Sequence, residues 1–242
     1  MGLGHAIKEQ APHSHFCAFY DTQTQRLRLL AEYYKVGLAR NERCIFVTDQ
    51  DPAELTMLLK RYGLDIKAAL SGGEFQIFSA TDTYLPGGVF NAQKMLDNLK
   101  DFVKKALELQ FAGVRGGGDM DWLAKDVPGR QDISDYEAEI NRFIGQNNFT
   151  GLCLFPADMS DVTLTKAIIK THQEILRNDT LYPNLYYSPP EEFFRPASNI
   201  PEEIQRWLDY MDKVEARLPK RSRSRVLKQA DAVVAELLTA RF

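Results

Sequence analysis

Thr150-Gly-Leu-Cys-Leu-Phe155 is the stretch that decides the fold class of this 242-residue chain. It is a short apolar run without a charged residue, which is typical of a strand buried on both faces of a parallel sheet. Cys44–Thr48 (CIFVT) has the same character, and helical apolar spacing lies between such runs, as in Thr22–Leu38. Strands that alternate with helices predict right-handed βαβ crossovers and a mostly parallel central sheet. The predicted fold class is therefore α/β.

The other predicted elements follow the same two patterns. Further strands are expected at His15–Tyr20, Phe75–Ser79, Gly113–Arg115 and, at the edge of the sheet, Asn184–Tyr187. Further helices are expected at Pro52–Tyr62, Asn91–Leu109, Ser134–Ile144 and Val162–Leu176. Asp21 is the expected N-cap of the first helix. The three glycines at 116–118 are expected to break the weak strand before them.

The chain changes character after Pro196. Pro201–Leu218 and Val226–Leu238 each carry an apolar stripe at helical spacing, and Pro219 separates them. This pattern predicts a helical hairpin with an apolar face that must be buried. Packing on the chain's own sheet, dimerisation and docking of a partner all satisfy that requirement.

The charge balance and the segment composition exclude several classes of protein. Thirty basic residues oppose 33 acidic ones, and a net charge of −3 recruits neither nucleic acid nor an anionic membrane. The longest stretch without a charged residue, Phe143–Ala157, is too short to span a bilayer. Met1–Pro12 lacks the apolar core of a signal peptide. Three widely separated cysteines do not form a disulfide framework. We expect a cytoplasmic protein that binds no specific nucleic acid and no membrane.

The turn after the first predicted strand argues against a nucleoside triphosphatase. A phosphate loop needs glycines, whose N–H groups form an anion nest, and a lysine for the β/γ-phosphates. The segment Tyr20–Arg26 has neither, and its one cation, Arg26, lies inside the predicted helix. Asp21 would also repel a phosphate there.

Seven short segments, in order, carry a resemblance to a known family. They are His15-Phe-Cys-Ala-Phe-Tyr20, Glu42-Arg-Cys-Ile-Phe-Val47, Tyr84-Leu-Pro-Gly-Gly-Val-Phe90, Gly113-Val-Arg115 with Gly118-Asp-Met-Asp-Trp122, Tyr136-Glu137, Leu152-Cys-Leu-Phe155 and Asn184-Leu-Tyr-Tyr187. Over residues 13–190 the chain resembles the MEDS family, the methanogen/methylotroph sensory domain, a degenerate relative of the RecA/KaiC-like ATPases. Asp119 departs from the family pattern, where Glu is expected.

The resemblance implies a RecA-like three-layer sandwich without ATPase machinery. It also implies a small organic ligand of the hydrocarbon-derived kind. We expect two domains, a MEDS-like sensory domain over residues 13–195 and the C-terminal helical hairpin over residues 197–242, which would serve dimerisation or partner docking.

Candidate site residues gather where the predicted strands end, because ligands of doubly wound sheets bind beyond the carboxyl ends of the strands. Glycines allow close backbone approach, while acidic and aromatic side chains supply acceptors and a wall. The predicted ligand contacts are Tyr20, Arg115, Asp119 and Trp122, with His15 and Cys17 beneath them. The alternative for the glycine segment is a turn with a capping aspartate and a packed tryptophan.

His13, His15 and Cys17 alternate and would share one face of a strand. Imidazoles and a thiolate are soft-metal ligands, yet no nearby fourth ligand is evident in the sequence. We favour a structural role for His15 and an inert, buried thiol for Cys17. The same interpretation of the thiol holds for Cys153. His172, at a helix end, would orient a ligand or be solvated. We expect no metal, no cofactor and no catalytic residue.

Three functions remain open at this stage. The first is a non-catalytic sensory domain of prokaryotic signal transduction or transcriptional regulation, with a kinase or regulator as protein partner and a homodimer through the hairpin. The second is a scaffold whose nucleotide pocket is vestigial. The third is an enzyme that uses Asp119 or Asp121 as general base near Arg115.

Overall fold

The computed structural model describes residues 3–9, 13–159, 161–177, 179–194 and 209. The predicted hairpin over residues 197–242 lies outside the described residues, apart from residue 209. Residues up to Phe193 belong to one compact unit and those from Phe194 to another.

A seven-stranded sheet forms the middle layer, and its strand order is β3-β2-β4-β5-β1-β6-β7. All neighbouring strands are parallel except β6 and β7, which pair antiparallel at one edge. The strands are β1 (His15–Tyr20), β2 (Glu42–Val47), β3 (Phe75–Phe78), β4 (Gly113–Asp119), β5 (Phe149–Pro156), β6 (Glu174–Arg177) and β7 (Thr180–Pro183). The α/β fold with a mostly parallel sheet is thereby confirmed.

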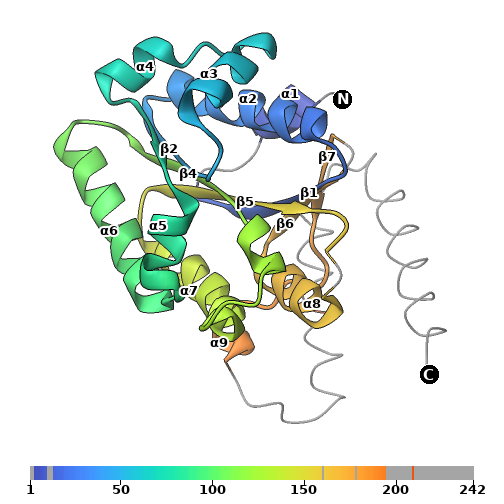
Figure 1. The fold of residues 1–242 in the computed structure, drawn as a ribbon. Coiled ribbons are helices and arrows are strands. Elements are labelled where there is room, and N and C mark those ends of the chain that lie inside the picture. Colours follow the sequence, from blue (N-terminus) through green and yellow to red (C-terminus); the bar gives the residue numbers. More distant parts are fainter. Residues whose placement is uncertain (1–2, 10–12, 160, 178, 195–208, 210–242) are drawn as a thin grey trace. The chain divides into compact units, whose positions relative to one another are not determined.

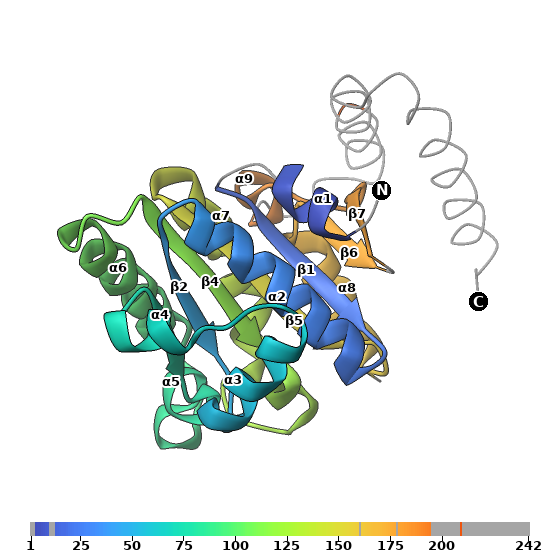
Figure 2. The same cartoon turned by 90° about the horizontal axis from the view of Figure 1, so that it is seen from above.

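Helices cover both faces of the sheet (Figures 1 and 2). One layer holds α1 (Leu3–Glu9), α2 (Gln23–Ala39), α3 (Pro52–Arg61) and α4 (Lys67–Gly72). The other holds α5 (Ala80–Tyr84), α6 (Ala92–Glu108), α7 (Ile133–Gln146), α8 (Val162–Thr171) and α9 (Pro190–Phe193). Each layer has its own apolar cluster, one centred on α2 and the other on α6 and α7. Within the described residues, no helix is long and apolar enough to cross a membrane.

The expected break at the three glycines was wrong. Gly116, Gly117 and Gly118 continue β4, which pairs with β2 on one side and β5 on the other. None of them has a positive φ. The reason for glycine is space, because a Cβ on Gly118 would lie 2.0 Å from the hydroxyl of Tyr84 and one on Gly117 would lie 2.5 Å from that of Tyr34. The low strand propensity of glycine is outweighed here, because neighbouring side chains pack directly against the glycine backbone.

Two element boundaries near the end of the described chain were also wrong. The helix expected over Val162–Leu176 ends at Thr171, and β6 follows it. The edge strand is β7 and not Asn184–Tyr187. The Asn184 side chain donates to the carbonyls of Ile169 and His172 and so fixes the end of α8. Asn184 therefore lies in a turn, where its side chain satisfies free carbonyl groups at the end of the helix, and not in a strand.

The N-cap of α2 is Thr22, not Asp21. Thr22 accepts from the backbone N–H of Gln25, and the Gln25 side chain accepts from the backbone N–H groups of Thr22 and Asp21. This capping box satisfies the free N–H group of Gln25 within the chain itself.

Candidate functional site

A cleft of about 440 Å³ opens at the carboxyl ends of β2 and β4, where sequence analysis predicted the site. Four acidic side chains and two basic ones take part in its lining: Asp49, Glu54, Asp119, Asp121, Arg26 and Lys125. An acidic surplus of this kind disfavours a polyphosphate.

Arg26 and Asp119 form a buried ion pair within this cleft. The Nε atom of Arg26 donates to Asp119 over 2.8 Å, a second guanidinium nitrogen donates to the other carboxylate oxygen, and Thr48 donates over 2.5 Å. Burial alone would lower the pKa of Arg26, but Asp119 outweighs it, so the pKa of Arg26 is raised. The Arg26 charge is thus matched within the chain.

Tyr20 and Trp122 lie beside this pair. The Tyr20 hydroxyl donates to Asp121 over 2.8 Å, and burial raises the pKa of Asp121. Trp122 stacks between Tyr84 and Phe90. The structure therefore brings Tyr20, Asp119 and Trp122 to the same edge of the sheet.

Arg115 was expected at this edge, and that placement was wrong. It lies near the start of β4, because the strand runs on through the glycines to Asp119. Its Nε donates to Glu42 over 2.5 Å, and its guanidinium lies 4.7 Å from the ring centre of Tyr33. Arg115 is fully buried in the layer of α2. The cation next to Asp119 is Arg26, so the pairing of Asp119 with Arg115 in the enzyme alternative does not form.

The sheet separates His15 and Cys17 from Tyr20, Arg115 and Asp119, whereas Trp122 packs in the same apolar cluster as Cys17. Side chains of successive strand residues point to opposite faces. Tyr20 and Asp119 face α2, while His15 and Cys17 face the layer of α7. The six predicted residues therefore do not line one pocket.

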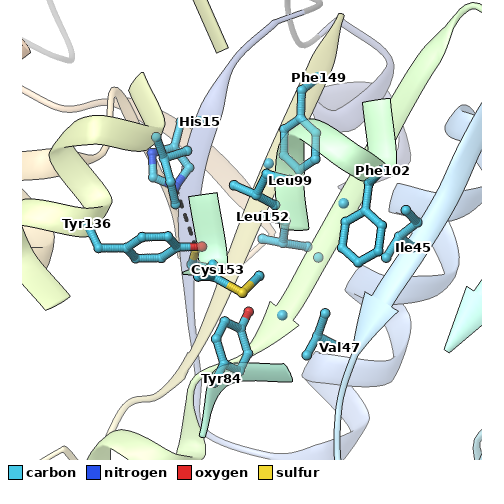
Figure 3. Close-up of a pocket in the computed structure, with 16 residues that line it drawn as sticks. His15, Ile45, Val47, Tyr84, Leu99, Phe102, Tyr136, Phe149, Leu152 and Cys153 are labelled. Atoms are coloured by element: carbon cyan, nitrogen blue, oxygen red, sulfur yellow. Dashed lines mark hydrogen bonds between the residues drawn. The ribbon is translucent and has the colours of Figure 1, made fainter. Parts of the chain in front are cut away.

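A second hollow, of about 40 Å³, lies under β4 on the face of α6 and α7. Figure 3 shows His15, Cys153 and Tyr84 on one side of it and Ile45, Val47 and Phe102 on the other. Its floor is the backbone of the three glycines. Most of its walls are apolar, and the polar exceptions are few.

Four titratable side chains converge beside this cavity. They are His15 from β1, Glu137 from α7, Cys153 from β5 and His172 at the end of α8, and their ligand atoms all lie within 4.8 Å of one another. The Nε2 atom of His15 lies 3.2 Å from Glu137 Oε2 and 3.5 Å from Cys153 Sγ. The Nε2 atom of His172 lies 3.6 Å from Glu137 Oε2. We call these four residues the buried tetrad.

Burial governs the charge of the tetrad. It lowers the pKa of His15 and of His172 to about 3, so both rings are neutral at physiological pH. It raises the pKa of Glu137 and that of Cys153, whose thiol also faces the Glu137 carboxylate. A carboxyl and a thiol without a cation beside them favour their protonated forms here.

Sequence reasoning missed several of these residues for a simple reason. The tetrad combines positions up to 157 residues apart, from 15 to 172, and only the sheet register and helix packing unite them. One signal was present, since Glu137 and Asn141 are polar residues on the otherwise apolar buried face of α7. His13, in contrast, lies before β1 with a φ of 58° and is not part of the tetrad.

Comparison with known proteins now identifies the family. The model of the MEDS family, described as the methanogen/methylotroph, DcmR sensory domain, matches residues 14–173, more than half of the chain. The transcriptional repressor DcmR of Methylorubrum extorquens is 26% identical over 166 residues, which are 68% of this chain and 60% of that protein. The matched region thus spans less than two thirds of the repressor.

A solved structure shares the fold. The KaiC-like protein PH0186 of Pyrococcus horikoshii superposes with a TM-score of 0.50 at 15% identity, covering 68% of this chain and 70% of that one. This likeness concerns the RecA-like fold alone. By the family match, the chain belongs to the MEDS family of sensory domains.

Proposed function

We propose that this protein is a non-catalytic sensor whose ligand is a small organic, hydrocarbon-derived molecule that binds in the cavity under β4. The family match and the repressor relative support a sensory or regulatory role. The observation that carries the ligand class is the cavity itself, with its apolar walls and its glycine floor.

The size of the cavity restricts the ligand. A space of about 10–15 Å³ holds one water molecule. The cavity of about 40 Å³ therefore accepts only a few non-hydrogen atoms without rearrangement. The Tyr84 hydroxyl supplies a polar contact that orients such a ligand.

The cleft at the strand ends supports the non-catalytic part of the proposal. Nucleotides bind this edge in related folds through helix N–H groups and a lysine. Here the capping box of Thr22 and Gln25 engages one of those N–H groups, that of Gln25, and Arg26 is paired with Asp119. This arrangement also supports the view that the nucleotide position is vestigial.

We base the proposed protein partner on the matching relative, which is a transcriptional repressor. A sensor needs a ligand-dependent change that a second component can read. A kinase or transcriptional regulator is the partner we propose, with residues 197–242 as the segment for docking or homodimerisation.

The ligand proposal is tested with alcohols and haloalkanes of one to four carbon atoms. Ligand that binds only the folded state raises the unfolding temperature, by the equivalent of about 2.7 kcal/mol at a concentration 100 times Kd. Val47→Leu adds one methylene to the cavity wall and should abolish the rise. Val36→Leu, a matched change in the layer of α2, should preserve it. Equal shifts in both variants, or no shift with any compound, would contradict the proposal.

A further inference from the structure

We propose that the buried tetrad of His15, Glu137, Cys153 and His172 binds one divalent transition-metal ion of the zinc type. The inference goes beyond the proposed sensor function, because it concerns the protein without any organic ligand.

The spacing of the ligand atoms fits a tetrahedral ion. Zinc–nitrogen and zinc–oxygen distances of about 2.0–2.2 Å and a zinc–sulfur distance of about 2.3 Å place tetrahedral ligand atoms roughly 3.3–3.8 Å apart. The three separations around Glu137 and His15 are 3.2, 3.5 and 3.6 Å, and Cys153 Sγ lies 3.7 Å from Glu137 Oε2. The two remaining separations, from His172 Nε2 to His15 and to Cys153, stay within 4.8 Å, so a shift of His172 by about 1 Å or less admits the ion.

The tautomer of His172 leaves a lone pair that faces another acceptor. Its Nδ1 lies 2.7 Å from the carbonyl oxygen of Ile168, so Nδ1 carries the hydrogen. In the neutral ring, Nε2 is then a bare acceptor, and it is buried with no hydrogen-bond partner. It faces the Glu137 carboxylate, which is also an acceptor. Something positive must lie between them, either a metal ion or a proton.

Asn141 interacts with His15 from outside the tetrad. The amide nitrogen of Asn141 donates to the carbonyls of Glu137 and Thr171. In the loaded site we place the His15 hydrogen on Nδ1, on the side of the Asn141 side chain that interacts with this ring, and the Nε2 lone pair toward Glu137 and Cys153. Outer hydrogen bonds of this kind set ligand tautomers in metal sites.

The charges of the donor set balance a divalent ion. Two neutral imidazoles, one thiolate and one carboxylate carry a charge of −2, so the loaded site is neutral in a region excluded from water. Loading releases the thiol proton and any proton held between Glu137 and His172. Mixed nitrogen, sulfur and oxygen ligands select zinc and its neighbours over magnesium or calcium.

The decisive experiment loads the full-length protein with metal alone. The protein is unfolded with a chelator, refolded with excess Zn²⁺ or Co²⁺, and desalted before metal analysis and absorption spectroscopy. We expect one ion per chain, with tetrahedral d–d bands and a thiolate-to-cobalt charge-transfer band.

Variants assign the ligands. Cys153→Ser should remove the charge-transfer band, and His172→Gln should weaken Zn²⁺ affinity by more than about 100-fold, beyond the loss seen for outer-sphere changes. Cys44→Ser, a buried cysteine in the layer of α2, is the matched control and should keep the band.

Refolded wild-type protein with substoichiometric metal and no cobalt–thiolate band would overturn the proposal and assign the charge between His172 and Glu137 to a proton. This result does not depend on whether a variant folds. It also leaves the organic-ligand experiment unaffected, so the two proposals fail separately.

Discussion

The Nε2 atom of His172 lies 3.6 Å from a carboxylate oxygen of Glu137, and both side chains are completely buried. Two acceptors at this separation need a cation or a proton between them. The contact joins α7 to the end of α8 and places buried polar groups beside the apolar cluster of this layer.

Glu137→Gln distinguishes a metal ion from a proton as the group between Glu137 and His172. The amide NH₂ donates to His172 Nε2 without a buried charge, so the metal-free variant should be at least as stable as wild type. The increase in unfolding temperature on metal loading should disappear. Denaturant unfolding with and without Zn²⁺ measures both effects. A metal-free variant that loses several kcal/mol would contradict this account of Glu137.

Gly118→Ala tests the reason for the glycines in β4. A Cβ there would lie 2.0 Å from the Tyr84 hydroxyl, and overpacking of this kind costs about 1–3 kcal/mol. Tyr84→Phe in the same chain should recover part of the loss, because it removes the clashing oxygen. Gly145→Ala is the control, since nothing lies within 4 Å of a Cβ on this residue of α7, and alanine favours a helix. Equal losses at both glycines would refute the steric explanation.

Arg26→Met should be strongly destabilising because it leaves the Asp119 carboxylate buried without its cation. Breaking one side of a buried pair costs about 3–5 kcal/mol. Adding Asp119→Asn should restore much of the stability. Arg28→Met on the same helix removes an exposed pair with Asp179 and should cost no more than about 1 kcal/mol. Chemical denaturation of the four proteins gives the comparison, and a small effect of Arg26→Met would argue against the buried ion pair.

Asp121 gives the cleft a pH dependence whose sign is defined. Burial and the neighbouring charges of Asp119 and Asp158 raise its pKa above 3.8, against the hydrogen bond from Tyr20 and the charge of Arg26. The folded state therefore holds this proton more tightly than the unfolded chain, and its contribution to stability is lost as pH rises through the folded pKa.

Asp121→Asn removes that loss and keeps an acceptor for Tyr20. The variant should be more stable than wild type at pH 7, and the advantage should vanish below pH 3.8. Thermal unfolding from pH 3 to pH 8 measures the difference. An advantage that is independent of pH would show that titration of Asp121 is not its cause.

The sequence predicted the layers of this protein better than its sites. Apolar runs such as 150–155 identify buried strands because burial on both faces requires continuous hydrophobicity. The same rule failed at β4, because its glycines leave space for long side chains of neighbouring elements. The end of α8 depends on hydrogen bonds from Asn184, which follows β6 and β7 in the chain and contacts the helix end only in the folded structure.

The site residues were only partly predictable for the same physical reason. Strand ends locate Tyr20, Asp119 and Trp122 because parallel strands share a carboxyl edge. The register of β4 decides on which face of the sheet each of its side chains lies. It therefore also decides that Arg26, rather than Arg115, contacts Asp119. The tetrad depends on contacts between four elements that no local pattern encodes.

The most direct test of the sensor proposal is a methyl NMR titration of the full-length protein with the alcohol and haloalkane panel. The account predicts the largest shifts at methyl groups that line the cavity, those of Ile45, Val47, Leu99 and Ile140. Shifts concentrated instead at Leu27 and Leu58, which line the cleft at the strand ends, would contradict it and move the ligand to that edge of the sheet.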